Sequence, residues 1–231
     1  MTTSPLLPLT AADLPPLAPE LVLIGSAFAL MILDLFVSNR NKIVTHLFSL
    51  AALAVVLFML ATGVGGQGEV FHGMFVRDTA ADVMKTGIVL LSGLTLVYGW
   101  RYLRDRNLFQ GEIPVLILFG TAGMMILVSA GSLLMVYLGL ELLALCSYAL
   151  VASNRENGLA SEAAMKYIVL GSLASGLLLY GMSLIYGATG SLHLDAINAA
   201  IPHTEEKMLL LTGAVFMIAG VAFKLGAAPF H

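Results

Sequence analysis

Long runs of apolar residues, separated by short polar segments, make up most of this chain. A helix needs about 20 apolar residues to cross the roughly 30 Å hydrocarbon core of a bilayer. The runs that come near this length are Leu21–Val37, Ile43–Val64, Met84–Trp100, Ile113–Val128, Ser132–Val151, Met165–Tyr186 and Met208–Ala228. They are continuous and do not alternate with period two, which excludes a membrane β-barrel. The pattern predicts an all-α integral membrane protein, a polytopic bundle of about seven transmembrane helices.

Composition agrees with this pattern and removes most other classes of protein. The 231 residues are 59% hydrophobic and 11% charged, with one cysteine. Soluble domains average about 45–50% apolar and about 25% charged residues. So little charge excludes a soluble enzyme, a disordered chain and a nucleic-acid binder, and one cysteine excludes an intrachain disulfide scaffold. We expect residues 1–20 to form an exposed N-terminal segment, and residues 21–231 a single transmembrane domain.

Basic residues indicate the orientation, because Lys and Arg gather in short cytoplasmic loops. With the N-terminus outside, the loop cations divide six to two in favour of the cytoplasmic side. The cytoplasmic group is Arg40, Lys42, Arg101, Arg104, Arg106 and Arg155, and the outer group is Arg77 and Lys207. We therefore expect the N-terminus to lie outside.

Motifs for cofactors and metals are missing from the sequence. It has no Gly-rich dinucleotide turn, no Walker loop and no paired cysteines. His193 and Asp195 form an H-x-D pair, but a metal site needs more ligands, so we expect a solvated loop there. Small residues such as Gly171, Ser175 and Gly213 favour close helix packing. We expect no metal or cofactor to be bound by this chain.

The ionisable residues inside the apolar runs are the candidate functional groups, because charge in a bilayer is costly. Asp34 and Lys85 lie within about a turn of a span end, so we expect their side chains to reach the headgroups. Glu141 lies nine residues after Ser132 and ten before Val151, about 14–15 Å from either side. A carboxylate near the midplane indicates a proton or ion path, or a hydrogen-bonded strut between helices.

Lys166 is a candidate partner for this carboxylate. If the sixth helix begins near Ser161, Lys166 lies about 8 Å deep, and the axial gap to Glu141 is about 7 Å. An ion pair between adjacent helices is then possible. Lys166 could equally extend toward the headgroups or pair with Glu162 at i−4.

Lys224 lies sixteen residues after Met208 and five before Pro229. In an unbroken helix it would reach the headgroups of the inner half of the bilayer. Alternatively, the proline breaks the helix inside the membrane, and Lys224 then faces a cavity, as in transporters with discontinuous helices. The sequence leaves both possibilities open.

Three segments resemble a known family: YLGLELLALCSYALVA at Tyr137–Ala152, EAAMKYIVLGSLASGLLLYGMSLIYGATG at Glu162–Gly190, and GVAFKLGAAPFH at Gly220–His231. Together they are similar to the subunit N family of NADH-quinone oxidoreductase, respiratory complex I, one of three antiporter-like membrane subunits. The resemblance is dense over residues 130–231 and weaker before them. The lack of a tryptophan beside Glu141 favours subunit N over its two paralogues.

The resemblance implies roles for three residues. Glu141 would be the fifth-helix glutamate, Lys166 the sixth-helix lysine, and Lys224 a seventh-helix lysine beside a helix break, all serving proton translocation. In such subunits the glutamate–lysine pair is thought to modulate the proton affinity of the seventh-helix lysine. Family members continue past the P-F-H motif, so this chain would be the N-terminal half of a longer antiporter-like subunit.

The resemblance also implies the setting. The chain would be a non-redox subunit of a translocase in the bacterial inner membrane, with a periplasmic N-terminus. Its partners would be other membrane-arm subunits and lipid, with no nucleic acid. The NADH, flavin, iron–sulfur clusters and quinone would belong to partner subunits. Two rival functions are a subunit of a multisubunit Na⁺/H⁺ antiporter, and a purely structural membrane-arm subunit.

Overall fold

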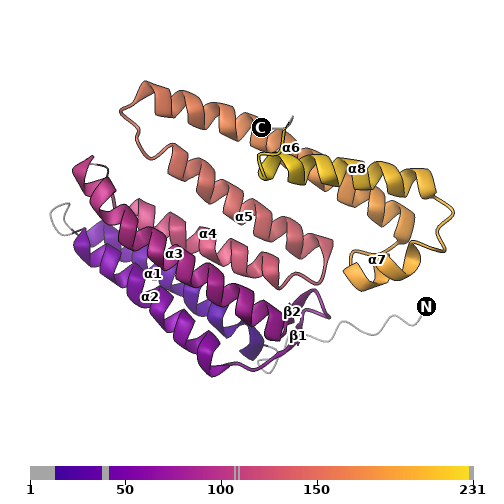
Figure 1. Ribbon diagram of the computed structural model, residues 1–231, viewed down its shortest axis with the longest axis horizontal. Helices are drawn as coiled ribbons and strands as arrows, with labels where there is room; N and C mark the ends of the chain where they lie inside the picture. Colours follow the sequence, from indigo (N-terminus) through magenta and orange to yellow (C-terminus); the bar gives the residue numbers. More distant parts are fainter. Residues whose placement is uncertain (1–13, 38–41, 107, 109, 229–231) are drawn as a thin grey trace.

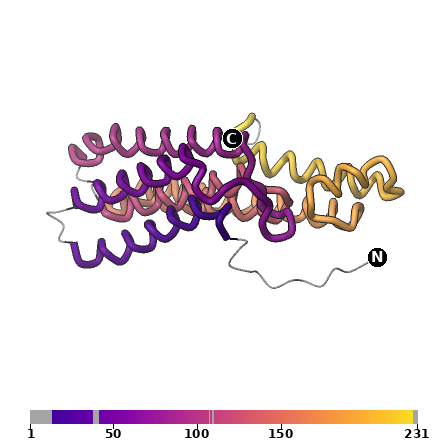
Figure 2. Tube along the Cα trace, turned by 90° about the horizontal axis from the view of Figure 1, so that it is seen from below, coloured from indigo at the N-terminus to yellow at the C-terminus, as the bar shows by residue number. Residues whose placement is uncertain are grey.

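A computed structural model describes residues 14–37, 42–106, 108 and 110–228 of the protein. All seven predicted helices are present in it, and six are long and apolar enough to cross a membrane. The seven are α1 (Ala18–Phe36), α2 (Ile43–Thr62), α3 (Thr79–Asp105), the shorter apolar α4 (Glu112–Val128), α5 (Leu133–Val151), α6 (Gly158–Thr189) and α8 (Lys207–Lys224). They lie side by side along the long axis of the molecule (Figures 1 and 2).

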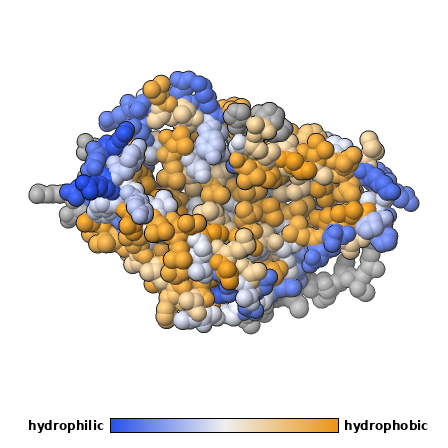
Figure 3. Space-filling view, viewed as in Figure 1, coloured by the Kyte–Doolittle hydropathy of each residue, from blue (hydrophilic) through white to orange (hydrophobic). Residues whose placement is uncertain are grey.

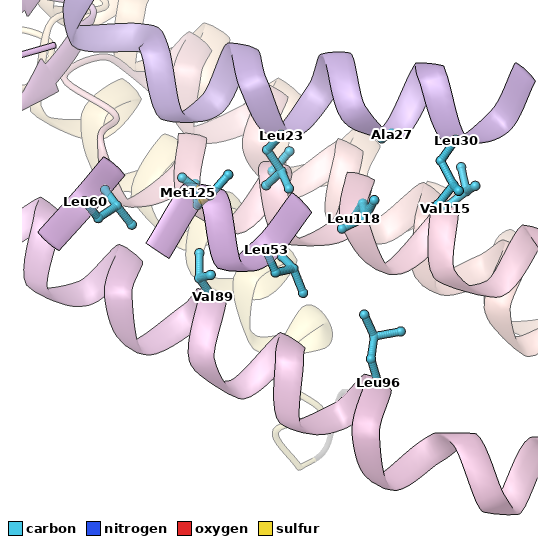
Figure 4. Packing of buried hydrophobic residues seen from close by; sticks show 12 residues of the cluster. Leu23, Ala27, Leu30, Leu53, Leu60, Val89, Leu96, Val115, Leu118 and Met125 are labelled. Atoms are coloured by element: carbon cyan, nitrogen blue, oxygen red, sulfur yellow. The ribbon is translucent and has the colours of Figure 1, made fainter. Parts of the chain in front are cut away.

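Helices α1 to α4 form the first bundle, and α4 packs against all three of the others. Its apolar side chains meet those of α1, α2 and α3 in one core (Figure 4). Leu118, Ala122 and Met125 of α4 are fully buried there. Because buried residues of α4 lie on most sides of the helix, its sequence is apolar all round rather than amphipathic.

Successive helices run in opposite directions, so the molecule has two ends. The hairpin end holds the strands β1 (Gly68–Val70) and β2 (Phe75–Arg77), which pair antiparallel with Gly68 opposite Arg77. The opposite end, which we call the Arg155 end, holds the start of α4 and the connection from α5 to α6. A short 3-10 helix, η2 (Pro15–Leu17), leads into α1 at the hairpin end.

Backbone contacts at the hairpin end connect the bundle of α1 to α4 with the helices that follow it. Phe75 of β2 forms a bridge with Ala130, just before α5. Ser132 forms another with His193, which precedes the short helix α7 (Leu194–Ala200). The start of α5 is therefore held from both sides, and the H-x-D segment opens a helix instead of a solvated loop.

Glycines bring two pairs of helices into close contact. A Cβ atom added to Gly123 of α4 would lie 2.9 Å from the carbonyl oxygen of Gly139 of α5. A Cβ atom on Gly181 of α6 would lie 2.7 Å from the carbonyl oxygen of Gly213 of α8. The prediction of small-residue packing is confirmed for Gly213, and it extends to the α4–α5 pair. Figure 1 shows α5 between α4 and α6, so the two close pairs lie next to each other.

The surface has the distribution expected of a membrane protein. Large apolar side chains are exposed along the helices, among them Phe28, Leu91, Val169 and Ile218. Figure 3 shows hydrophobic residues across the middle of the molecule and hydrophilic ones toward its ends. The predicted class, an all-α integral membrane bundle, is confirmed.

The structure corrects two predicted helix limits. The sixth helix begins at Gly158, with the Asn157 side chain accepting from the Leu159 N–H, so Ser161 is not its N-cap. The seventh predicted span ends at Lys224 and does not continue to Ala228.

The predicted exposed segment also needs correction where it is described. Leu17 is buried, and Glu20 is 2% exposed in the first turn of α1. This part of the chain packs under the hairpin, against Val70 and Phe75. Residues 1–13 lie outside the described residues.

Candidate functional site

The mid-helix carboxylate and the lysine at the end of α8 form an ion pair. Glu141 is the ninth residue of α5, in the middle of that helix, as the sequence predicts. Lys224 is the last residue of α8, and its Nζ lies 3.0 Å from Glu141 Oε1. Their side chains are 21% and 12% exposed. The structure therefore brings together two of the three predicted site residues.

Ser175 of α6 is a third member that sequence reasoning did not identify as functional. Its hydroxyl donates to Glu141 Oε1, the oxygen that Lys224 also contacts. Lys224 Nζ in turn donates to Ser175 Oγ at 3.0 Å. A carboxylate, a hydroxyl and an ammonium group from three helices thus form a closed triangle, which we call the Glu141–Ser175–Lys224 site.

No spacing within the sequence reveals Ser175, because its partners lie 34 and 49 residues away on other helices. The sequence shows it only as a small residue, and small residues are expected wherever helices touch. It is 5% exposed. A hydroxyl buried at this depth needs a partner, and both of its hydrogen bonds are made to charged groups.

A glycine ends α8 at the site. Gly226 has φ +64°, in the left-handed region, and its N–H donates to the carbonyl of Phe223. The N–H of Ala227 donates to the carbonyl of Ala222. This pair of bonds is a Schellman motif, a common helix termination that requires a left-handed residue. The helix therefore ends through Gly226, in an exposed segment beside the site. The sequence suggested Pro229 as the cause, and that residue lies outside the described residues.

The position of Lys224 at the C-terminal end of α8 favours its positive charge. The last turn of a helix carries partial negative charge on its free carbonyls, which favours a cation there. The ammonium group of Lys224 is therefore stabilised by the end of its own helix as well as by Glu141. In the structure α8 ends at Lys224, and the ammonium group of this lysine contacts Glu141.

Lys166 does not contact Glu141. Its Nζ lies 2.6 Å from Glu162 Oε1, one turn earlier on α6, and its side chain is 70% exposed. It is nine residues from Ser175, about 14 Å along the helix. The sequence estimate of a 7 Å gap was too small, because it assumed that the end of α5 and the start of α6 lie at the same depth. In the structure Glu141 instead lies beside Ser175, well past Lys166 along α6. The i−4 alternative is the one that the structure contains.

Two tyrosines, Tyr137 and Tyr148, lie on the face of α5 that carries Glu141. Tyr148 is 6% exposed and faces α6, where its ring meets Tyr167 edge to face, with centroids 4.7 Å apart. Tyr137 lies one turn from Glu141 on the other side and packs in the α5–α6–α8 core. The polar face of α5 thus extends from Glu141 in both directions, to Tyr137 on the side of the hairpin end and to Tyr148 on the side of the Arg155 end.

A second buried ion pair corrects the prediction that Lys85 reaches the headgroups. Lys85 of α3 is fully buried, and its Nζ lies 2.6 Å from Oε1 of Glu20 in α1. The same ammonium group lies 4.9 Å from the centre of the Phe75 ring. Sequence reasoning missed the pair because it placed Glu20 in an exposed segment.

Asp34 is also paired inside the protein. Both of its carboxylate oxygens accept from Lys42 Nζ at 2.8 Å, and the pair is partly buried. The prediction for Asp34 was therefore wrong about its surroundings. Neither this pair nor Glu20–Lys85 contains a member of the Glu141–Ser175–Lys224 site.

Comparison with known proteins finds a matching family for the second part of the chain and similar sequences for all of it. The family described as "NADH:quinone oxidoreductase/Mrp antiporter, TM" matches residues 130–231, which include the whole site. NADH-quinone oxidoreductase subunit N of Xanthomonas euvesicatoria pv. vesicatoria (strain 85-10) is 79% identical over 231 residues, which is 100% of this chain and 47% of that relative. The chain spans about half the length of the curated relatives it matches.

More distant proteins agree. Subunit N of Halorhodospira halophila (strain DSM 244 / SL1) is 49% identical over 214 residues, covering 92% of this chain and 44% of the relative. Among solved structures, a chain of "Respiratory complex I from Thermus thermophilus with bound Aureothin" matches with a TM-score of 0.73 and 30% identity, covering 92% of this chain and 45% of that one. By sequence and by fold, this chain belongs to the antiporter-like membrane family of NADH:quinone oxidoreductase, among the relatives of its subunit N.

Proposed function

We propose that this chain supplies part of a proton path in a membrane subunit of a proton-translocating NADH:quinone oxidoreductase. The observation that carries the proposal is the Glu141–Ser175–Lys224 site, with an ion pair of 3.0 Å inside a bundle of apolar helices. Buried ionisable groups in membrane proteins mark ion and proton paths, because they are too costly to keep otherwise.

Each group of the site is suited to handling protons. A carboxylate and an amine each exist in two protonation states, and a hydroxyl both donates and accepts a hydrogen bond. Lysine can release its proton, whereas the guanidinium of arginine stays protonated. A change in the charge of Glu141 acts on Lys224 at contact distance, because opposite charges favour each other's charged forms. The pair can therefore hold a proton in one state and pass it on in another.

Lys166 has a different place in this proposal. With Glu162 it forms an exposed pair toward the Arg155 end of α6. Its part in proton translocation is therefore at the approach to the site, and Lys224, not Lys166, is the cation that faces Glu141.

The wider setting follows from the relatives. The chain would act within a membrane arm beside other antiporter-like subunits and lipid, and NADH, flavin, iron–sulfur clusters and quinone would be bound by partner subunits. The bacterial inner membrane is the proposed location. The six-to-two division of loop cations supports a periplasmic hairpin end and a cytoplasmic Arg155 end.

Substitution of Lys224 separates the proton path from a structural role. In reconstituted vesicles of the full-length complex, Lys224→Arg keeps the positive charge at Glu141 but cannot release a proton near neutral pH. We expect proton flux per NADH oxidised to fall strongly with both Lys224→Arg and Lys224→Ala, at matched complex content. Lys207→Arg, at the exposed start of the same helix, is the matched control and should keep the flux.

The rival functions give other results. If the charges only hold helices together, Lys224→Arg assembles and pumps like the unsubstituted protein, which would refute the proposal. An antiporter subunit would couple the same groups to Na⁺, so sodium uptake by the vesicles, abolished by Lys224→Ala, would decide for that function.

A further inference from the structure

The Tyr148 side chain lies between the Glu141–Ser175–Lys224 site and the Arg155 end. Tyr148 follows Glu141 by seven residues, two turns along α5, so both side chains lie on one face. It is 6% exposed. A phenol buried between apolar helices needs a polar neighbour for its hydroxyl, because a lost hydrogen bond is costly there.

Gly171 of α6 leaves the space that the Tyr148 hydroxyl occupies. A Cβ atom added to Gly171 would lie 2.0 Å from that hydroxyl oxygen, so any other residue would displace it. Gly171 is one turn from Ser175 on the same face of α6. The glycine thus fixes a hydroxyl beside the site on the side of the Arg155 end.

Tyr167 of α6 lies beyond Tyr148, on the side away from the Glu141–Ser175–Lys224 site. It is one turn from Gly171 toward the Arg155 end, and its ring contacts that of Tyr148 edge to face. Tyr167 is exposed, whereas Tyr148 and Ser175 are buried. Hydroxyl-bearing side chains therefore lead from the surface of α6 inward, in the order Tyr167, Tyr148, Ser175.

We propose that Tyr148 is a relay through which protons from the Arg155 end reach the Glu141–Ser175–Lys224 site. This inference rests on the proposed function. In the relay, the Tyr148 oxygen gains a proton from the Tyr167 side while its own O–H bond breaks and that proton passes toward Ser175 and Glu141. Tyr148 is a neutral phenol before and after the step, and no electrons are transferred.

Substitutions of Tyr148 in the full-length complex test the relay. Tyr148→Phe keeps the ring and its packing but removes the hydroxyl. We expect proton flux per NADH oxidised to fall by at least about tenfold, since a positioned proton-transfer group contributes about 100-fold or more. Tyr148→His is smaller and more polar, but it can accept and give a proton. We expect it to restore part of the flux.

If Tyr148 served packing alone, proton flux would be higher with Tyr148→Phe than with Tyr148→His, because Phe fills the space of the tyrosine better than His. Tyr180→Phe is the matched control: Tyr180 is an exposed tyrosine of α6 whose ring also makes an edge contact, with Phe216. The Tyr180→Phe variant should keep the proton flux of the unsubstituted protein. Assembly of the complex, measured for each variant, should stay unchanged with Phe.

The outcomes distinguish the relay from the proposed function. Normal flux with Tyr148→Phe, together with a loss of flux in Glu141→Gln, would overturn the relay and leave the proposed function standing. Normal flux in both would remove the proposed function and the relay with it. Higher flux with Phe than with His, or loss of assembled complex with Phe, would assign Tyr148 a packing role and overturn the relay.

Discussion

Removing one partner of the Glu20–Lys85 ion pair should be costly, because the other charge stays buried. Lys85 is fully buried and Glu20 3% exposed at the side chain, with 2.6 Å between the charged atoms. At an effective dielectric constant of about 20, two unit charges at this distance attract by about 6 kcal/mol before desolvation is counted. Breaking a buried pair by removing one partner typically costs about 3–5 kcal/mol, because the other charge stays buried.

We therefore expect Lys85→Met to lower the free energy of unfolding by about 3–5 kcal/mol, and Glu20→Gln by a similar amount. The double variant leaves no unpaired charge, so its cost should be less than the sum of the two by about 2–3 kcal/mol. The measurement is equilibrium denaturation of the full-length subunit in detergent. The exposed pair Glu162–Lys166 is the matched control, with an expected coupling of about 0.5 kcal/mol or less.

Two results would contradict this reasoning. If Lys85→Met costs less than about 1 kcal/mol, the lysine is either solvated or neutral in the folded protein. If the double variant costs the sum of the single variants, the two side chains do not interact energetically, whatever their distance.

Two further predictions concern the end of α8 and the orientation. Gly226→Ala and Gly63→Ala each force a side chain into the left-handed region at a helix end and should each cost about 1 kcal/mol of stability. Only Gly226→Ala should also lower proton flux, and equal flux in both variants would show that the helix end does not position the site. In a Cys146→Ala background, Asp105→Cys should be labelled only from the cytoplasm and Glu69→Cys only from the periplasm. The reverse labelling would invert the proposed orientation.

The sequence predicts the helices well because membrane helices leave long apolar runs, and every predicted run is a helix in the structure. It also places Glu141 at mid-helix from residue counts alone, since the rise per residue is constant. The sequence does not correctly predict which charged residues pair with one another. Lys166 is the candidate partner of Glu141 by depth, but the rotation and register of α6 and α8 place Lys224 there instead.

The other failures have the same cause. Glu20 reads as part of an exposed segment because its burial depends on a hairpin 50 residues away in the chain. Ser175 has no local signal, because a hydroxyl that bridges two other helices looks like any small packing residue. Gly226 could have been found, since a glycine just past a last-turn lysine is a standard helix stop.

The glycine contacts between helices have a mechanical consequence for the charged site. Gly123 and Gly139 join α4 to α5 at backbone distance, and Gly181 and Gly213 do the same for α6 and α8. Helices in such close contact move together, because sliding one past the other would open their packing. The Glu141–Lys224 pair lies across the seam between these two rigid units. A change in the charge of either residue therefore changes the attraction between the α4–α5 pair and the α6–α8 pair.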